Sequence, residues 1–451
     1  MSDARKRLLA AGMSEQEATR KQGLLEKADA GLLRLRGVAP GEVFRWWVPG
    51  RIEFLGKHTD YAGGRSLLCV PERGICVAAA PRQGDRFRVH DAITGETLDE
   101  RMSEHALLEA TSQPGHWSNY VRAVARRLVR NFPTPALTGA DVVLASDLPQ
   151  AAGMSSSSAL VVATFLALAR VNNLQSRDAY RRAIQTGEQL AEYLGTIENG
   201  QSFGDLAGER GVGTFGGSED HTAILCAKAG TLMQYAFCPV RLERTVPFPK
   251  DHVLVVATSG VAAEKTGAAR DRYNNLSTTI FEILDRWQSM TGERYRTLAA
   301  AIAASPGAAD RIRQMLEGAA PGGEDERIAR FEHFLLESDS LIPAAADALA
   351  QGDHAKLGTL ADQSQQSAER LLGNHIPETS FLARQARELG AVAASAFGAG
   401  FGGSVWALLP ERDAVAFRGR WADVYATRFP AAATQSEFFV THAGPGAVEL
   451  T

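Results

Sequence analysis

The feature that most constrains the fold is a strand, a loop of small residues and an apolar helix, which follow one another between residues 141 and 171. Residues 141–147, DVVLASD, predict a strand. Residues 158–171 predict a helix that is apolar around most of its circumference, and such a helix is buried in a folded protein. The segment therefore predicts part of a packed core, with the loop at its edge.

The loop of this segment, LPQAAGMSSSSA at 148–159, ends in the four serines Ser155–Ser158. A serine run disfavours a helix interior, because the hydroxyls compete for backbone hydrogen bonds. At a helix start, free N–H groups and the helix dipole can bind a phosphate, and the hydroxyls add donors and one possible Mg²⁺ ligand. An over-supplied N-cap is the alternative, and the loop lacks the GxxxxGK[ST] pattern of the common nucleotide loop.

Length and composition set the architecture and exclude some functions. A chain of 451 residues is too long for one compact core, so we expect two domains, at 1–225 and 226–451. A net charge of -4 gives no basic field for nucleic acid or an anionic membrane. No apolar run reaches the ~20 residues of a membrane span, and the charged N-terminus lacks a secretory signal. We therefore expect a cytoplasmic protein.

Periodicity and turn signals predict helices and strands that are mixed without strict alternation, which indicates an α+β fold. Strands are predicted at 43–48, 51–55, 65–80, 86–91, 252–258 and 436–441, with a hairpin at 223–237. Helices are predicted at 1–38 (packed at the edge of the first domain), 116–132, 176–195 with Ser176 as N-cap, through most of 266–390, and at 411–428. The Gly-rich stretch 195–219 is long for a simple connection, so we expect it to be functional or mobile.

Three further segments carry polar or glycine-rich patterns. Residues 49–64, PGRIEFLGKHTDYAGG, can present donors and acceptors to a polyhydroxylated ligand, and the Arg51 fork suits a phosphate. The alternative for this segment is a solvated hairpin. Residues 398–404, GAGFGGS, run into a strand, so they are either a binding loop or a tight turn. Asp220, in a Gly-rich segment predicted to precede a strand, is either a base or a turn cap.

Taken together and in this order, PGRIEFLGKHTDYAGG, LPQAAGMSSSSAL and AFGAGFGGSVWALL resemble the three motifs of the GHMP kinases. Trp117 and its neighbours, WSNYV, are similar to a segment of the galactokinase branch. The resemblance covers residues 44 to 410. It implies a two-domain fold of mixed sheets and helices, with the active site in the cleft between the domains. It also implies transfer of the ATP γ-phosphate to the anomeric hydroxyl of galactose or a related sugar.

The resemblance implies roles for individual residues. It makes Asp220 the base that takes the proton of the hydroxyl, and Arg51 the partner that keeps this carboxylate ionised and stabilises the transferring phosphate. It assigns Mg²⁺ to Ser157 and Glu188, with Glu192 and Glu198 as further candidates. It assigns the sugar to Lys57, His58, Asp60, Gly217 and Tyr273, and ATP to Gly153, Met154, Ser155, Ser156, Ser157, Ser158, Trp117, Gly400 and Gly402.

One position departs from the resemblance. Galactokinases have glutamate where this chain has Lys57, and a lysine can only donate hydrogen bonds. Either the sugar carries a carboxylate there, as a hexuronic acid does, or Lys57 turns to Glu53 or Asp60 and the sugar is neutral. A sugar sensor without catalysis is the alternative from another class, but Arg51, Ser157 and Asp220 are present. The remaining expectations are a small-molecule sugar partner and a monomer or small homo-oligomer.

Overall fold

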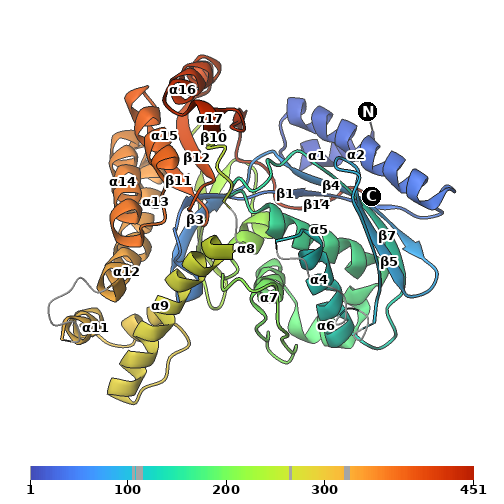
Figure 1. The fold of residues 1–451 in the computed structure, drawn as a ribbon, viewed down its shortest axis with the longest axis horizontal. Helices are drawn as coiled ribbons and strands as arrows, with labels where there is room; N and C mark the ends of the chain where they lie inside the picture. The colour runs from blue at the N-terminus through green and yellow to red at the C-terminus, as the bar shows by residue number, and fades with distance from the viewer. Residues whose placement is uncertain (1, 104–106, 108–114, 264–266, 319–325) are drawn as a thin grey trace.

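The computed structural model describes residues 2–103, 107, 115–263, 267–318 and 326–451 (Figure 1). The strands are β1 (Phe44–Pro49), β2 (Ile52–Leu55), β3 (Arg65–Cys69), β4 (Gly74–Arg82), β5 (Arg86–Asp91), β6 (Thr97–Arg101), β7 (Gly139–Ser146), β8 (Thr231–Ala236), β9 (Arg241–Pro247), β10 (His252–Thr258), β11 (Ala393–Phe397), β12 (Ser404–Pro410), β13 (Phe438–Thr441) and β14 (Val448–Glu449).

The helices of the first half are α1 (Asp3–Ala10), α2 (Glu15–Arg36), α4 (Ser118–Asn131), α5 (Ser156–Val171), α6 (Asp178–Ala183), α7 (Gly187–Asn199) and α8 (Glu219–Cys226). Those of the second half are α9 (Gly267–Thr291), α10 (Leu298–Ala303), α11 (Ala308–Glu317), α12 (Glu326–Leu335), α13 (Ile342–Gln351), α14 (His354–Ser367), α15 (Pro377–Glu388), α16 (Ala414–Arg428) and α17 (Pro430–Ala433). Short 3₁₀ turns are η1 (Asp60–Ala62), η2 (Leu174–Ser176) and η5 (Glu411–Asp413), and π-helical segments are η3 (Leu336–Leu341) and η4 (Ala368–Leu372).

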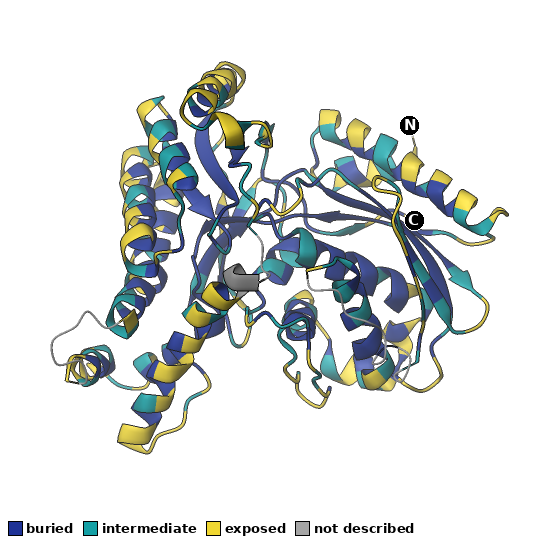
Figure 2. Cartoon of the chain, viewed as in Figure 1, coloured by how far each residue is buried: buried dark blue, intermediate teal, exposed yellow. Residues whose placement is uncertain are grey.

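The strands form three sheets, with orders β14-β1-β4-β7-β5-β6, β2-β3-β8-β9 and β11-β12-β10-β13. Neighbouring strands are antiparallel except for β5 and β7, which are parallel. Helices cover these sheets, and the most apolar strands and helices are buried between the layers (Figure 2). The expected α+β fold of mixed sheets and helices is confirmed.

The N-terminal helices lie over a face of the six-stranded sheet rather than at an edge, as Figure 1 shows for α2 (blue). Ala28 and Leu32 of α2 pack against Ala78 and Ala145 of the sheet. The small alanines let the helix approach the strands closely. The expectation that residues 1–38 pack at the edge of the first domain stays a prediction, and α5 packs on the same sheet through β4, β1 and β7.

Two secondary-structure predictions are wrong, and the second of them changes the element that carries Asp220. The helix predicted at 176–195 is divided into η2, α6 and α7, and the N-cap with a full capping box is Thr186 rather than Ser176. The hairpin predicted at 223–237 begins later, as β8 and β9, because Asp220 and the residues after it form α8. Asp220 therefore lies in the first turn of a helix instead of just before a strand.

The domain division between residues 225 and 226 stays a prediction. In the structure, two pairs of neighbouring strands combine a strand from each side of this boundary. β3 pairs with β8, which follows the predicted boundary. β14, from the C-terminus, pairs with β1 through Trp46 and Glu449. The two halves of the chain are thus joined by shared sheets.

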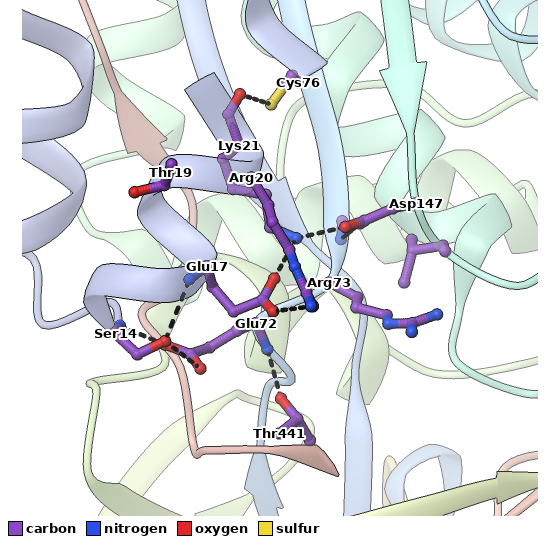
Figure 3. A network of polar contacts seen from close by, with 12 residues as sticks. Ser14, Glu17, Thr19, Arg20, Lys21, Glu72, Arg73, Cys76, Asp147 and Thr441 are labelled. Carbon is purple, nitrogen blue, oxygen red and sulfur yellow. Dashed lines mark hydrogen bonds and ion pairs between the residues drawn. The ribbon is translucent and has the colours of Figure 1, made fainter. Parts of the chain in front are cut away.

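A polar network reinforces this joint (Figure 3). The Ser14 hydroxyl donates to Glu72, in the β3–β4 connection, over 3.0 Å. The Glu72 backbone N–H donates to Thr441 of β13 over 2.8 Å. Nearby, the fully buried Lys21 ammonium donates to Glu17 over 2.9 Å and also to Asp147. The N-terminal helices are therefore bonded to the first sheet and, through Glu72, to β13. Within the described ranges, no helix is long and apolar enough to cross a membrane.

Candidate active site

The three sequence motifs meet at one place in the fold. The backbone N–H of Arg51, in the first motif, donates to the carbonyl of Met154, in the serine loop, over 3.0 Å. The Ser404 hydroxyl, in the third motif, donates to the carbonyl of Ala152 over 2.5 Å. The serine loop is therefore held between the first and third motifs by backbone contacts.

The glycines of the third motif are required by close packing. Gly398 has a φ of +87°, and a Cβ atom there would lie 2.7 Å from the carbonyl oxygen of Gly153. Gly400 has a φ of +80°, and its Cβ would lie 2.3 Å from the carbonyl oxygen of Asn374. A Cβ on Gly402 would approach the protein backbone in the same way. The tight turn with close packing, one of the two interpretations, is thus present, and ATP contact by Gly400 and Gly402 stays a prediction.

The serine loop contains a buried hydroxyl, that of Ser155, without a hydrogen-bond partner in the described part of the chain. Ser155, the N-cap of α5, has a left-handed φ of +57° and makes no side-chain cap. Its buried hydroxyl lacks a hydrogen-bond partner among the described residues. A non-glycine residue with positive φ costs energy and is typical of functional sites. The over-supplied N-cap therefore does not account for Ser155, whereas a bound phosphate would.

Arg51 and Asp220 form the closest charged contact of the site. The Arg51 Nε atom donates to Asp220 Oδ1 over 2.7 Å, and Nη2 lies 2.5 Å from the same oxygen. Burial lowers the pKa of Arg51, but the attraction of Asp220, Glu219 and Glu53 outweighs it and raises the pKa above the ordinary value. The Asp220 side chain is 15% exposed, so one face of it remains accessible.

Ser158 and Glu198 contribute a second pair of oxygen groups beside Asp220. The Ser158 hydroxyl lies 2.7 Å from Glu198 Oε1 and 3.3 Å from Asp220 Oδ2. His221 Nε2 lies 3.2 Å from the same Glu198 oxygen. Hydroxyl and carboxylate oxygens are the ligands that Mg²⁺ prefers, so the donor set fits this ion.

Glu188, the predicted metal ligand, lies at the end of α7 that is farther from Asp220. Glu188 lies in the first turn of α7 and lines another cavity, whereas Glu198 lies in the last turn. Ten residues of helix separate them by about 15 Å. Glu192 accepts from the backbone of Val240 and pairs with Arg296. The structure thus places Glu198, one of the further candidates, at the site, and Ser158 rather than Ser157 contacts it.

The predicted sugar residues His58, Asp60 and Tyr273 line one cavity with Arg51 and Asp220. The cavity is open to solvent, and both halves of the chain contribute to it. Its full lining is Arg51, Glu53, His58, Asp60, Tyr61, Ser158, Glu198, Thr214, Gly216, Gly217, Glu219, Asp220, His221, Tyr273, Gly398 and Ala399. The expected position between the two halves is confirmed.

Each sugar-side group is held by its neighbours. His58 Nε2 lies 3.1 Å from the carbonyl oxygen of Ala399, so this nitrogen carries the proton. His58 Nδ1 lies 3.1 Å from the Tyr61 hydroxyl, which then donates to it. Asp60 accepts from the backbone N–H atoms of Tyr61 and Glu219. The turn at η1 is therefore buried and ordered by hydrogen bonds, and the solvated hairpin is wrong.

Gly217 fits against Asp60 because it has no side chain. A Cβ atom at Gly217 would lie 2.3 Å from Asp60 Oδ2. Tyr273 lies beside the neighbouring Gly216, where a Cβ atom would lie 2.6 Å from the tyrosine hydroxyl, and its ring is 5.4 Å from that of His58. The predicted sugar contacts Gly217 and Tyr273 are thus brought to the cavity with His58 and Asp60.

The Lys57 side chain points neither toward a sugar carboxylate in the cavity nor toward Glu53 or Asp60, the two alternatives that the sequence left open. Its Nζ atom donates to the hydroxyl of Ser364, in α14, over 2.8 Å. Ser364 in turn donates to Glu337, in η3, over 2.9 Å. Lys57 is 1% exposed and is not part of the cavity lining, and its ammonium donates to Ser364 rather than to Glu53 or Asp60.

The long stretch after α7 is fixed to α4 by two arginines. Arg127 donates to the carbonyl oxygens of Ala207 and Gln201, each over 2.6 Å. Arg126 pairs with Glu209 over 2.8 Å. The stretch ends in Thr214, Gly216 and Gly217, which line the cavity. It therefore forms a wall of the site that is anchored at its base.

The remaining ATP-side predictions lie around the serine loop. Ser156 and Ser157 begin α5 and are half-buried, and Met154 is buried. Trp117 is the N-cap residue of α4, and its indole N–H donates to Glu96. These residues do not line the cavity described above, and their contact with ATP stays a prediction.

Two acids at the site were not among the predicted residues. Glu53, on β2, and Glu219, the first residue of α8, are both buried and line the cavity. Burial raises the pKa of Glu53 to about 7 against the lowering effect of Arg51 and Lys57. Burial and the charge of Glu53 raise the pKa of Glu219 well above its ordinary value. A glutamate between the apolar residues of a buried strand was the available signal for Glu53.

Comparison with protein-family models finds three matching regions. Residues 119–203 match the GHMP kinases N terminal domain, and residues 345–427 match the GHMP kinases C terminal region. Residues 37–81 match the galactokinase galactose-binding signature, which spans the first motif.

Curated relatives and a solved structure extend these matches over the whole chain. A galactokinase of Chloroflexus aggregans is 30% identical over 406 residues, which cover 88% of this chain and 92% of the relative. A galactokinase of a Roseiflexus species is 29% identical over 413 residues, with the same coverage. The crystal structure of Lactococcus lactis galactokinase complexed with galactose has a TM-score of 0.75 and 22% identity, and covers 93% of this chain and 98% of that one. The last match establishes a common fold.

Proposed function

Because this chain belongs to the galactokinase branch of the GHMP kinases, we propose that it transfers the γ-phosphate of ATP to the anomeric hydroxyl of galactose or a closely related neutral sugar. The observation that carries the proposal is the Arg51–Asp220 pair, which faces the cavity shared with His58 and Asp60. A base beside a phosphate-binding cation, next to groups that can orient hydroxyls, is what this transfer requires.

Asp220 takes the proton of the attacking hydroxyl in this proposal. Its Oδ1 atom is occupied by the Arg51 fork, and its Oδ2 atom accepts from Ser158 over the longer distance of 3.3 Å. Oδ2 is therefore the oxygen that we assign to the hydroxyl proton. The guanidinium holds the carboxylate in place and stabilises the negative charge that develops on the transferring phosphoryl group.

The serine loop and the neighbouring acid would hold ATP and its metal ion. Ser155 offers an unused hydroxyl within the described part of the chain, at the start of α5, where the helix dipole favours an anion. Ser158 and Glu198 would hold Mg²⁺, in keeping with their hydroxyl and carboxylate oxygens. When bound, Mg²⁺ neutralises charge on the phosphate oxygens.

His58, Asp60 and Tyr273 would orient the sugar. The carboxylate of Asp60 accepts hydrogen bonds, and the aromatic ring of Tyr273 gives the sugar an apolar surface. The buried direction of Lys57 supports a neutral sugar, because its ammonium donates to Ser364 outside the cavity lining. A carboxylate-bearing sugar would instead require this ammonium in the cavity.

A substrate panel tests the proposal. ATP consumption is measured with galactose, galacturonate, glucuronate and arabinose, and the product is identified by ³¹P NMR. Galactose or arabinose should give a sugar 1-phosphate, with turnover of either uronate at least about tenfold lower, which is 1.4 kcal/mol of discrimination. Preferential uronate turnover would reverse our assignment of the sugar class. Sugar binding without any ATP turnover would favour a sensor and overturn the kinase.

A further inference from the structure

Two buried carboxyl groups beside the Arg51–Asp220 pair have no part in the mechanism above. The exposed fraction is 4% for Glu53 and 5% for Glu219. Both line the cavity that contains Asp220. Glutamates are almost never buried to this degree unless they are paired, so their surroundings must compensate for the loss of water.

The hydrogen bonds of these two groups are incomplete. Glu219 Oε2 accepts from the Ser66 hydroxyl over 2.6 Å. Oε1 of Glu53 and Oε1 of Glu219 are both buried, and neither accepts a hydrogen bond from a donor in the described ranges. Both carboxyl groups face the Arg51 guanidinium, and a side-chain hydrogen bond with Glu219 lowers the pKa of Glu53. Two carboxylates cannot form that bond, because neither has a proton to donate.

The charges around Arg51 lead to the same conclusion. Glu219 Oε1 lies 3.5 Å from Arg51 Nε, and Glu53 Oε2 lies 3.9 Å from Nη1, while the shorter contacts go to Asp220. One guanidinium thus faces three carboxyl groups, of which those of Glu53 and Glu219 are buried. Lys57 and Glu337 also face Glu53 and carry opposite charges, and Asp60 and Asp220 add negative charge beside Glu219. Full ionisation would leave a water-poor site with excess negative charge.

We propose that Glu53 and Glu219 share one proton and act as a positioning pair for Arg51. The shared proton completes the hydrogen bond between the two carboxyl groups and removes one negative charge from the site. Arg51 is then left to make its closest contacts with Asp220. The inference rests on the proposed function, because it assigns the pair a role in that reaction. Two carboxyl groups at close range hold a proton more strongly than either does alone, in agreement with the raised pKa values of both.

The pair has a definite effect on activity. Below the pH at which the shared proton is lost, Arg51 serves Asp220 and the phosphate. Above it, the second carboxylate competes for Arg51 and adds repulsion toward the phosphate. Because the pKa of Glu53 is raised to about 7, the loss falls at or above neutral pH, and kcat/KM should decline on the alkaline side.

The pH profile of kcat/KM in the wild type and in Glu219→Gln and Glu53→Gln tests the proposal. We expect the wild-type value to fall by about tenfold for each pH unit beyond an ionisation at or above 7. Each amide variant can donate an N–H to the remaining carboxylate at any pH, so its profile should lack this decline. Glu388→Gln, an exposed carboxylate on α15, is the matched control and should keep the wild-type profile. An alkaline decline that is identical in all four proteins would overturn the shared proton.

A second measurement needs neither a substitution nor turnover. The wild type is labelled with ¹³C at glutamate side-chain carboxyls, which leaves Asp60 and Asp220 unlabelled, and is titrated by NMR from pH 5 to pH 9. We expect a glutamate carboxyl signal that titrates at or above about pH 7. If every glutamate signal titrates below pH 6, the shared proton does not exist. A titrating pair in a protein that phosphorylates no sugar would contradict the proposed function alone.

Discussion

Arg51 and Arg127 are both buried arginines, but they face opposite kinds of partner. Arg51 lies among the carboxyl groups of Asp220, Glu219 and Glu53, and their attraction raises its pKa. Arg127 donates to backbone carbonyl oxygens, and burial lowers its pKa. The first arrangement concentrates charge where a phosphate would be transferred. The second fixes the wall of the same cavity, so one residue type provides reactivity in one place and rigidity in the other.

The largest effect is expected when the carboxylate of the Arg51–Asp220 pair is removed. Asp220→Asn should lower kcat by ~10²–10⁴-fold, because the amide cannot accept the hydroxyl proton. Steady-state kinetics with the best sugar measure this, and ATP binding by calorimetry should change little. Asp423→Asn, an exposed residue on α16, is the control. If kcat survives in Asp220→Asn, the base is another group.

The second largest effect is expected when Arg127, which fixes the cavity wall, is replaced. Arg127→Met removes donors from three backbone carbonyl oxygens, which include that of Thr196 in α7. We expect the free energy of unfolding to fall by about 1–3 kcal/mol, since the carbonyl of Gln201 loses its donor, whereas those of Ala207 and Thr196 still accept from Asn131 and Gly200. Urea denaturation measures it, with the exposed Arg182→Met as the control. A loss equal to that of the control would show that the wall holds without Arg127.

A smaller effect is expected from a substitution that disturbs the close contact between Gly217, in the cavity wall, and Asp60. In Gly217→Ala, the new methyl group would lie 2.3 Å from Asp60 Oδ2 and must displace it. We expect KM for the sugar to rise about tenfold, within the ~1–3 kcal/mol of an overpacked contact, while KM for ATP stays the same. Gly419→Ala, on α16 with no atom within 4 Å of the added carbon, is the control. An equal rise of both KM values would place the disturbance outside the sugar side.

The smallest effect concerns an ion pair at the joint between the two halves. The hydrogen bond with Glu72 raises the pKa of His442 above its ordinary value. The stability from this pair is therefore complete below about pH 6.5 and is lost as the pH rises through the raised pKa. The His442 side chain is 44% exposed, so solvent screening limits the contribution to less than about 1 kcal/mol.

Urea denaturation of wild type and His442→Gln checks this at two pH values. The difference in free energy of unfolding should be larger at pH 6 than at pH 9. The same difference at both values would show that the charge of His442 contributes nothing.

The sequence predicted the parts of the site that depend on local pattern. Arg51, His58 and Asp60 belong to one continuous segment, and a single turn carries them to the cavity together. Glycines with backbone or side-chain atoms against them, such as Gly398 and Gly217, also leave a visible mark in the sequence. Asp220 was predicted as a candidate, although its surroundings were expected to be a turn and a strand.

Contacts between distant segments could not be predicted in the same way. Glu188 and Glu198 lie on one helix, and only the packing of α7 beside α5 and α8 decides which end meets Ser158. The orientation of the Lys57 side chain depends on Ser364, which lies 307 residues later in the chain and is itself bonded to Glu337.

The sequence by itself thus determined the family, the mixed α+β fold and the meeting of three motifs around Arg51 and Asp220. The tertiary structure alone decided which carboxyl groups surround that pair. Glu53 and Glu219 are 166 positions apart, and nothing local to either indicates the other. The fold buries both side chains beside Arg51, and it is this shared loss of solvent that makes a shared proton favourable.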